Sequence, residues 1–200
     1  MIKLTKLRFV CYVLLSATGC YLIVSCNSQK REMQETVEKM RQKAIEIPYE
    51  RMDCWTNDSI IDVSPWQKAK MKLVHYIDSA TCSTCYLQKA ATNEFLHSME
   101  NMSDNEFCNV FIINPDKKAR KRLEADFKDK QIPSTIFVDS ANVFLEVNPN
   151  IPTESMYHTF LLDEGNKVIL VGNPMLNKQI GDMVIAVLEK QLGKKLYNKN

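Results

Sequence analysis

The chain has 200 residues, of which 45% are hydrophobic, and a formal net charge of +2. Three of its 26 Lys and Arg and none of its 24 Asp and Glu lie in the first 25 residues, so the remainder carries 23 basic and 24 acidic side chains. This balance excludes a strong field that would attract nucleic acid, and the length suffices for one domain with a sizeable core.

The N-terminal segment has the pattern of a secretory signal peptide. It begins with three positive side chains, Lys3, Lys6 and Arg8, and continues as an apolar run from Phe9 to Ser25. The length and flanks of this run are those of a signal peptide rather than of a membrane span. We therefore expect residues 1–25 to lie outside the fold.

The apolar run closes on the sequence LIVSC, residues 22–26. An aliphatic residue three positions before Cys26 and a small residue just before it resemble a bacterial lipobox, which implies that Cys26 receives a lipid. An uncleaved anchor helix is the alternative. Both interpretations place the rest of the chain outside the cytoplasm, tied to a membrane. By resemblance, Asn27 in place of aspartate favours the inner leaflet of the outer membrane.

Beyond Cys26, four of the seven cysteines remain: Cys54, Cys82, Cys85 and Cys108. In an oxidising compartment, thiols are either bonded or deliberately kept reduced. A domain of roughly 170 residues needs no disulfide staples for its stability. The C-x-x-C spacing of Cys82 and Cys85 therefore points to chemistry.

Residues 27–47 lack Gly and Pro and carry a thin apolar stripe, which predicts a helical spacer that ends at Pro48. Residues 48–68 are predicted to be irregular. From residue 69, nearly continuous apolar runs alternate with segments of helical periodicity. The expected strands are 71–77, 107–114, 134–139, 158–163 and 167–172, and the expected helices are 82–99, 115–131, a short one around Phe144, and one capped by Asn177.

The order β-α-β-α-β-(short α)-β-β-α predicts an α/β fold with a central mixed sheet flanked by helices. Strand–helix–strand units imply right-handed parallel crossovers, and the turn EGN predicts a closing antiparallel hairpin. We expect a signal peptide at 1–25, a lipidated cysteine and spacer at 26–48, and one domain at 49–200. There is no internal repeat and no low-complexity segment.

A C-x-x-C at a strand-to-helix junction, followed by this element order, resembles a thioredoxin fold. The extra strand and connection at 132–157, and the segment HTFLLDEGNKVILVGNP at 158–174, resemble the TlpA-like and peroxiredoxin branch. With the lipobox, the chain resembles a thioredoxin-like lipoprotein of a Gram-negative bacterium, over about residues 69–192. The resemblance implies a thiol–disulfide oxidoreductase of the periplasmic cell envelope, with a redox-active disulfide.

The first cysteine of the pair is expected at the start of a helix, where unpaired backbone N–H groups favour a thiolate. Cys82 is expected to be exposed, and Cys85, one turn later, more buried. By resemblance, Cys82 attacks a partner disulfide and Cys85 resolves the mixed disulfide. Ser83 and Thr84 stand between the cysteines, and Thr81 replaces the usual Trp.

The family's cis-proline is a second departure. Its place before the strand at 158–163 is taken by Tyr157 and His158. A cis bond without proline costs about 2.5–4 kcal/mol, so we expect a trans bond. A rival alignment, which starts from Pro133, would leave the hairpin at 158–172 outside the standard order.

Several polar residues are candidates around the dithiol. His158, in the preferred alignment, lies near Cys82 and could favour its thiolate, or it only starts a strand. Asp78 could relay a proton to or from Cys85, or it caps the loop. Tyr86 could shape a docking face or simply pack.

Other features have simpler interpretations. Cys54 is a third redox partner or an unpaired thiol outside the core order, and Cys108 is a small buried hydrophobe. His75 is expected to pack. The basic segment 117–122 is a solvated helical face or, alternatively, a docking patch for an acidic partner.

Three functions remain to be weighed. The first is a membrane-tethered thiol–disulfide oxidoreductase whose partners are exported proteins with disulfides or thiols and a membrane redox donor. The second is peroxide reduction, which needs the motif P-x-x-x-T-x-x-C around its reactive cysteine. The proline and threonine positions before Cys82 hold His75 and Ser79 instead. The third is a non-catalytic module that binds a protein, or copper through both cysteines and His158. We expect no cofactor, no resident metal and no nucleic-acid partner.

Overall fold

The structure is a computed structural model that describes residues 28–57, 61–129, 132–133 and 135–196. The predicted signal peptide and the lipid-bearing Cys26 lie outside these residues. In the described part of the chain, no helix has both the length and the apolar character of a membrane span.

The chain divides into two compact units, Met1–Lys39 and Met40–Asn200. The described residues of the first unit are helical and mostly exposed, with an ion pair of 2.9 Å between Arg31 and Glu35. The second unit begins at Met40, ahead of the boundary at residue 49 that the sequence suggests. Met40 and Ile45 are buried apolar side chains of this unit, and the N–H of Ile45 donates to the carbonyl of Asn166 at 2.8 Å.

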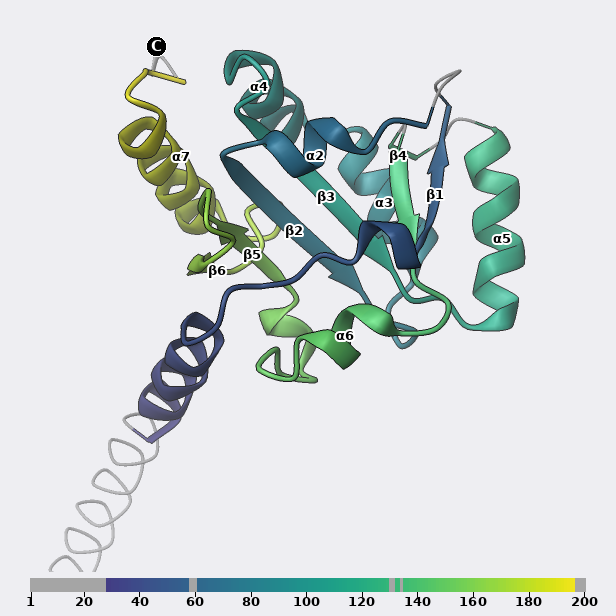
Figure 1. Ribbon diagram of the computed structural model, residues 1–200, viewed down its shortest axis with the longest axis horizontal. Helices are drawn as coiled ribbons and strands as arrows, with labels where there is room; N and C mark the ends of the chain where they lie inside the picture. The colour runs from purple at the N-terminus through teal and green to yellow at the C-terminus, as the bar shows by residue number, and fades with distance from the viewer. Residues whose placement is uncertain (1–27, 58–60, 130–131, 134, 197–200) are drawn as a thin grey trace, which may run out of the picture. The chain divides into compact units, whose positions relative to one another are not determined.

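One six-stranded sheet organises the second unit, in the order β1-β4-β3-β2-β5-β6 (Figure 1). Its three central strands are parallel neighbours, and the other three pair antiparallel. The strands are β1 Asp53–Thr56, β2 Met71–Ile77, β3 Phe107–Ile113, β4 Thr135–Val138, β5 Thr159–Leu162 and β6 Val168–Val171. All seven residues of β2 are buried, as its continuous apolar run predicts for a strand covered on both faces.

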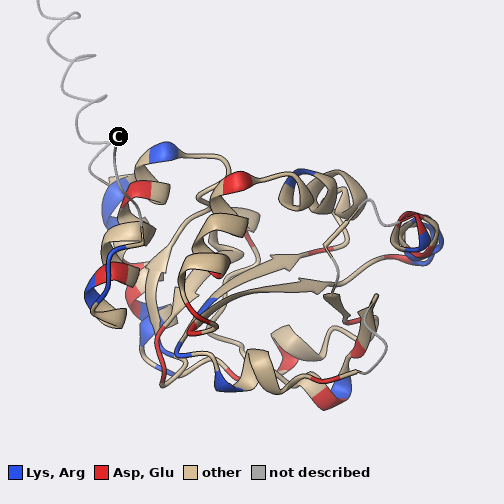
Figure 2. Cartoon of the chain, turned by 90° about the horizontal axis from the view of Figure 1, so that it is seen from above, with Lys and Arg blue, Asp and Glu red and all other residues tan. Residues whose placement is uncertain are grey.

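The helices connect these strands and cover both faces of the sheet. They are α2 Ser64–Lys68, α3 Ser83–Ala91, α4 Glu94–Met102, α5 Lys117–Lys128, α6 Val143–Val147 and α7 Lys178–Leu192, with 3-10 turns η1 Tyr49–Arg51 and η2 Ser155–Tyr157. Figure 2 shows the sheet almost free of charged residues, which lie mainly on helices and loops. This distribution matches the amphipathic patterns of the sequence.

Two cores lie against the two faces of the sheet. The larger one joins odd-numbered residues of β2, such as Leu73 and Ile77, to α3, α4, α5 and α7. On the opposite face, Phe137 of β4 meets the rings of Tyr49 and Trp66 edge-on, with centroids 5.0 and 5.5 Å away. The dithiol segment therefore belongs to the layer of the larger core.

The thioredoxin-like α/β arrangement predicted from the sequence is confirmed by this topology. The hairpin of β5 and β6 lies beside β2, with Thr159 opposite His75. The rival alignment from Pro133 is wrong, because the following strand, β4, neighbours β3 and β1 instead of β2. All described peptide bonds are trans, including the bond between Tyr157 and His158.

Two elements differ from the prediction. The helix expected at 82–99 is two helices, because the side chain of Asn93 accepts from the N–H of Leu96 at 3.1 Å and starts a new helix there. The supposedly irregular segment 48–68 contains β1, which pairs along β4 with Cys54 opposite Phe137. Cys54 is therefore part of the sheet, at its edge.

Candidate functional site

Cys82 and Cys85 are joined by a disulfide, with their Cα atoms 5.4 Å apart. Cys82 is the N-cap of α3, and its Sγ accepts from the N–H of Cys85 at 3.4 Å. The pair follows the carboxyl end of β2, where the first turn of a helix presents unpaired N–H groups. This position stabilises negative charge on Cys82 Sγ once the disulfide is opened.

The second cysteine is not more buried than the first, contrary to the expectation from the sequence. Both Cys82 and Cys85 are exposed. The buried side chains of α3 are Ser83, Leu87 and Ala90, spaced four and three residues apart. Because this stripe turns Ser83 to the core, Cys85 falls on the outward side of the helix.

Asp78 shapes the loop that leads to the dithiol. Its Oδ1 accepts from the N–H of Thr81 at 2.9 Å, from the Thr81 hydroxyl at 2.8 Å and from the N–H of Ala80 at 3.1 Å. This is the capping geometry of an aspartate turn. The structure thus gives Asp78 a role in positioning the loop, and no described contact joins it to Cys85.

His158 is buried, 3% exposed, and contacts neither cysteine among the described interactions. Its Nε2 lies 3.0 Å from the carbonyl of Pro152, and its Nδ1 lies 3.5 Å from Oδ2 of Asp78. Its own carbonyl accepts from the N–H of Tyr76 at 2.8 Å. The residue in the cis-proline position is therefore connected to the dithiol loop through Asp78.

Tyr86, next to Cys85, points into the protein rather than onto a docking face. Its hydroxyl lies 2.8 Å from Nδ1 of His75, accepts from the Asn173 amide at 2.9 Å, and lies 3.3 Å from the Thr159 hydroxyl. Burial raises the pKa of Tyr86 to about 12 and lowers the pKa of His75 to about 4. The sequence predicts packing for His75 and leaves Tyr86 open between packing and a docking face. It does not predict the network, because the four members lie on separate segments of the chain.

A pocket of about 330 Å³ opens beside Cys82. One wall is the loop from Ser79 to Thr84, and the other wall is the first turns of α5. The side chains of α5 and its cap that line it are Asp116, Lys118, Ala119 and Arg122. The basic segment predicted at 117–122 thus contributes two of its cations to the dithiol site.

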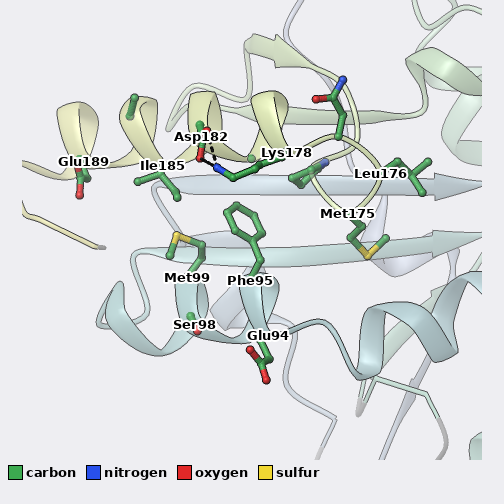
Figure 3. Close-up of a pocket in the computed structure, with 14 residues that line it drawn as sticks. Glu94, Phe95, Ser98, Met99, Met175, Leu176, Lys178, Asp182, Ile185 and Glu189 are labelled. Carbon is green, nitrogen blue, oxygen red and sulfur yellow. Dashed lines mark hydrogen bonds and ion pairs between the residues drawn. The ribbon is translucent and has the colours of Figure 1, made fainter. Parts of the chain in front are cut away.

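A larger pocket of about 890 Å³ lies between α4 and α7 (Figure 3). Phe95 and Met99 of α4 face Ile185 of α7 across it, and Lys178 pairs with Asp182 at its rim. No cysteine or histidine lines this pocket. It offers packing surface without redox chemistry.

The other two cysteines within the described residues are free and lie away from the dithiol loop, Cys54 on β1 and Cys108 on β3. Burial raises the pKa of both thiols, that of Cys108 to about 12. Among the described residues, no group of three His, Cys, Asp or Glu side chains is arranged to hold a metal ion. The copper site envisaged from Cys82, Cys85 and His158 therefore has no geometric support.

Comparison with known proteins gives structural neighbours only, since no protein-family model and no curated protein matches the chain. A thioredoxin-like protein of Bacteroides caccae matches with 12% identity and a TM-score of 0.47, over 80% of this chain and 54% of its own, so the chain spans about half of that protein. StoA of Bacillus subtilis matches with 15% identity and a TM-score of 0.41, over 58% of this chain and 84% of its own.

PrxQ of Xylella fastidiosa, in a form with one cysteine replaced by serine, matches with 10% identity and a TM-score of 0.44, over 72% of this chain and 95% of its own. Identities and TM-scores of this size add nothing to the fold assignment. That assignment stands on the strand order and on the disulfide at the start of α3. The chain has a thioredoxin-like fold.

Proposed function

We propose that this protein is a thiol–disulfide oxidoreductase that acts on cysteines of exported proteins. The observation that carries the proposal is the exposed Cys82–Cys85 disulfide at the N-cap of α3. Both cysteine residues are exposed, and the first one lies where backbone N–H groups stabilise a thiolate.

The proposed reaction exchanges one disulfide for another. The Cys82 thiolate attacks one sulfur of a substrate disulfide, an S–S bond forms between protein and substrate, and the other substrate sulfur leaves as a thiolate. The thiolate of Cys85 then attacks Cys82 Sγ, which releases the second substrate thiol and restores the Cys82–Cys85 disulfide. Two electrons pass to the substrate, and a membrane redox donor then supplies two more electrons, which with two protons reduce the Cys82–Cys85 disulfide to the dithiol again. Oxidation of a substrate is the reverse sequence.

Asp78 is assigned a supporting role in this scheme. It fixes Thr81, the residue before Cys82, through two hydrogen bonds, and so holds the start of α3 in place. His158 supports Asp78 from the buried side. Both are positioning residues in the proposal, and neither transfers a proton to a sulfur.

The location is part of the proposal. A signal peptide at 1–25, a lipid on Cys26 and a helical segment after it would tether the dithiol domain to the membrane and expose it to the periplasm. The inner leaflet of the outer membrane is the proposed site, in line with Asn27. Labelling cells with a radioactive fatty acid tests the anchor: the wild-type chain incorporates label, and Cys26→Ser does not.

Activity is tested on the full chain in detergent by the reduction of insulin with dithiothreitol. We expect the wild type to accelerate the reaction and Cys82→Ser to lower it to the rate of dithiothreitol alone. Cys108→Ser is the matched control and should keep the full rate. A Cys82→Ser protein as active as the wild type contradicts the proposal, and a wild type that accelerates nothing supports a non-catalytic binding module instead.

A further inference from the structure

The basic side chains of α5 are not equivalent. Arg120 is engaged within the protein: it lies 2.9 Å from Asp53 and 3.6 Å from Glu124, its guanidinium stacks over Trp55 at 5.4 Å, and it donates to the Ser140 hydroxyl. Lys118 and Arg122 are exposed, and in the described part of the chain no side-chain ion pair or hydrogen bond involves them. Lys118 and Arg122, like the exposed Lys117 and Lys121, are thus open to an external anion.

Lys118 and Arg122 share a face of α5. They are four residues apart, which places them one above the other on a helix, and both line the pocket that contains Cys82. Figure 2 shows α5 end-on at the right, with charged positions around it. Lys117 and Lys121 belong to the same basic segment but do not line the pocket.

One acidic side chain lines the pocket beside its two cations, so the charged lining residues keep one net positive charge. Asp116 also lines it, but its Oδ1 caps α5 by accepting from the N–H groups of Lys118 and Ala119 at 2.8 and 2.7 Å. Asp78 is occupied by the dithiol loop. The N-terminus of α3 adds its own positive partial charge beside Cys82.

We propose that Lys118 and Arg122 select substrates that carry acidic residues beside the reacting cysteine. The inference rests on the proposed oxidoreductase function and names its substrate class. A polypeptide whose sulfur reaches Cys82 must lay its neighbouring residues in the pocket, where aspartate or glutamate meets two unpaired cations. Such pairs raise the association rate and specificity more than the intrinsic reactivity, and salt weakens them.

The experiment uses the full chain in detergent and two synthetic disulfide-bonded peptides, identical except that glutamates or lysines flank each cysteine. With dithiothreitol as the reductant, we expect kcat/KM to be about tenfold higher for the acidic peptide at low ionic strength. The double variant Lys118→Gln/Arg122→Gln should reduce both peptides with the same kcat/KM. Molar salt should likewise abolish the preference of the wild type for the acidic peptide. Lys121→Gln is the matched control and should keep the preference.

Binding separates this inference from the function on which it rests. Serine analogues of the two peptides need no redox turnover, so fluorescence anisotropy measures the charge preference by itself. Reduction without a preference in rate or in binding overturns the inference and leaves the proposed function standing. A charge preference in binding without any reduction supports the charge preference and contradicts the proposed oxidoreductase function. A preference that persists in Lys118→Gln/Arg122→Gln also overturns the assignment to these residues.

Discussion

Cysteines and charged side chains lie at both the carboxyl and the amino ends of the parallel strands, but their exposure and their contacts differ between the two ends. At the carboxyl end, the loop after β2 carries Asp78 and the exposed Cys82, and the loop after β4 begins with Asp139. At the amino end, Lys72 of β2 lies opposite Cys108 of β3. The same residue types are thus available at both ends.

Acids at the carboxyl end are used to hold backbone in place. Asp139 is buried, and its two oxygens accept from the N–H groups of Val143 and Phe144 at 2.8 and 2.9 Å. Asp78 does the same for the dithiol loop. The acids at this end therefore hold loops in place, and the exposed sulfur-bearing residues are Cys82 and Cys85.

Groups at the amino end are paired or buried instead. The ammonium of Lys72 donates to the carbonyl of Ala69 at 2.7 Å and to the Asn166 side chain at 3.1 Å, and burial lowers the pKa of this lysine. Burial raises the pKa of Cys108 to about 12. The two ends therefore differ in the exposure of their cysteines and in the helix N-terminus beside Cys82, rather than in residue type.

The largest expected effect is a difference in thiol reactivity between the two ends. In the reduced, folded protein at pH 7, Cys82 should react with iodoacetamide about a thousandfold faster than Cys108, because a thiol with a pKa of about 12 is almost never ionised. Mass spectrometry of the alkylated peptides over time measures both rates. In urea the two rates should converge, and equal rates in the folded protein would contradict the comparison.

His75, in the middle of β2 between the two ends, should make the free energy of unfolding depend on pH. Burial lowers the pKa of His75 to about 4, whereas the unfolded chain binds this proton near pH 6.5. The free energy of unfolding should therefore fall as the pH drops from about 6.5 to about 4, by roughly 3 kcal/mol from this residue, and no further below. Above pH 6.5 the residue contributes no pH dependence.

Urea denaturation of the wild type and His75→Gln at several pH values measures this contribution. The difference between the two proteins isolates His75 from the carboxylates, including Glu100, whose pKa burial raises. A wild type and variant with parallel pH profiles would show that the histidine proton is not linked to folding.

Sequence patterns predicted those parts of the molecule that depend on local signals. Each of these signals can be recognised from a few consecutive residues. They are the continuous apolar runs of β2 and β3, the helix cap at Asn177 and the turn before β6. The C-x-x-C at the start of a helix is a signal of the same kind. The order of the elements follows from these signals, and the thioredoxin-like fold was predicted from the resemblance of that order to a known family.

Structural features that depend on contacts between residues distant in the chain were not predicted from the sequence. β1 has only four residues and becomes a strand through its pairing with β4. Ser83 is polar, so its position in the buried stripe of α3, which turns Cys85 outward, does not show as apolar periodicity. His158 lies beside Asp78 instead of Cys82, and its backbone carbonyl accepts from the N–H of Tyr76 on the neighbouring strand β2.

Ser83 allows a smaller test at the carboxyl end. The residue is 4% exposed, and its hydroxyl has no hydrogen-bond partner in the described part of the chain. Ser83→Ala should raise the free energy of unfolding by about 1 kcal/mol, because it removes a buried polar group that is not satisfied. Urea denaturation with an unchanged m-value measures the gain. A loss of stability would mean that the hydroxyl is hydrogen-bonded in solution and helps to hold the dithiol turn.

The smallest expected effect lies at the amino end, in the exposed charges around Glu106. Its carboxylate lies 2.8 Å from Lys194 and 2.5 Å from Lys70, and these two ammonium groups lower its pKa to about 2. The stabilisation from this group is therefore present above about pH 4.5 and is lost as the pH falls towards 2. Glu106→Gln should lower the midpoint of urea denaturation slightly at pH 7 and low ionic strength, and molar salt should erase the difference because it screens exposed pairs. Since the Cys82–Cys85 disulfide lies at the other end of the sheet, we expect the variant to reduce insulin at the wild-type rate. A slower rate would mean that the two ends are coupled through β2 and β3.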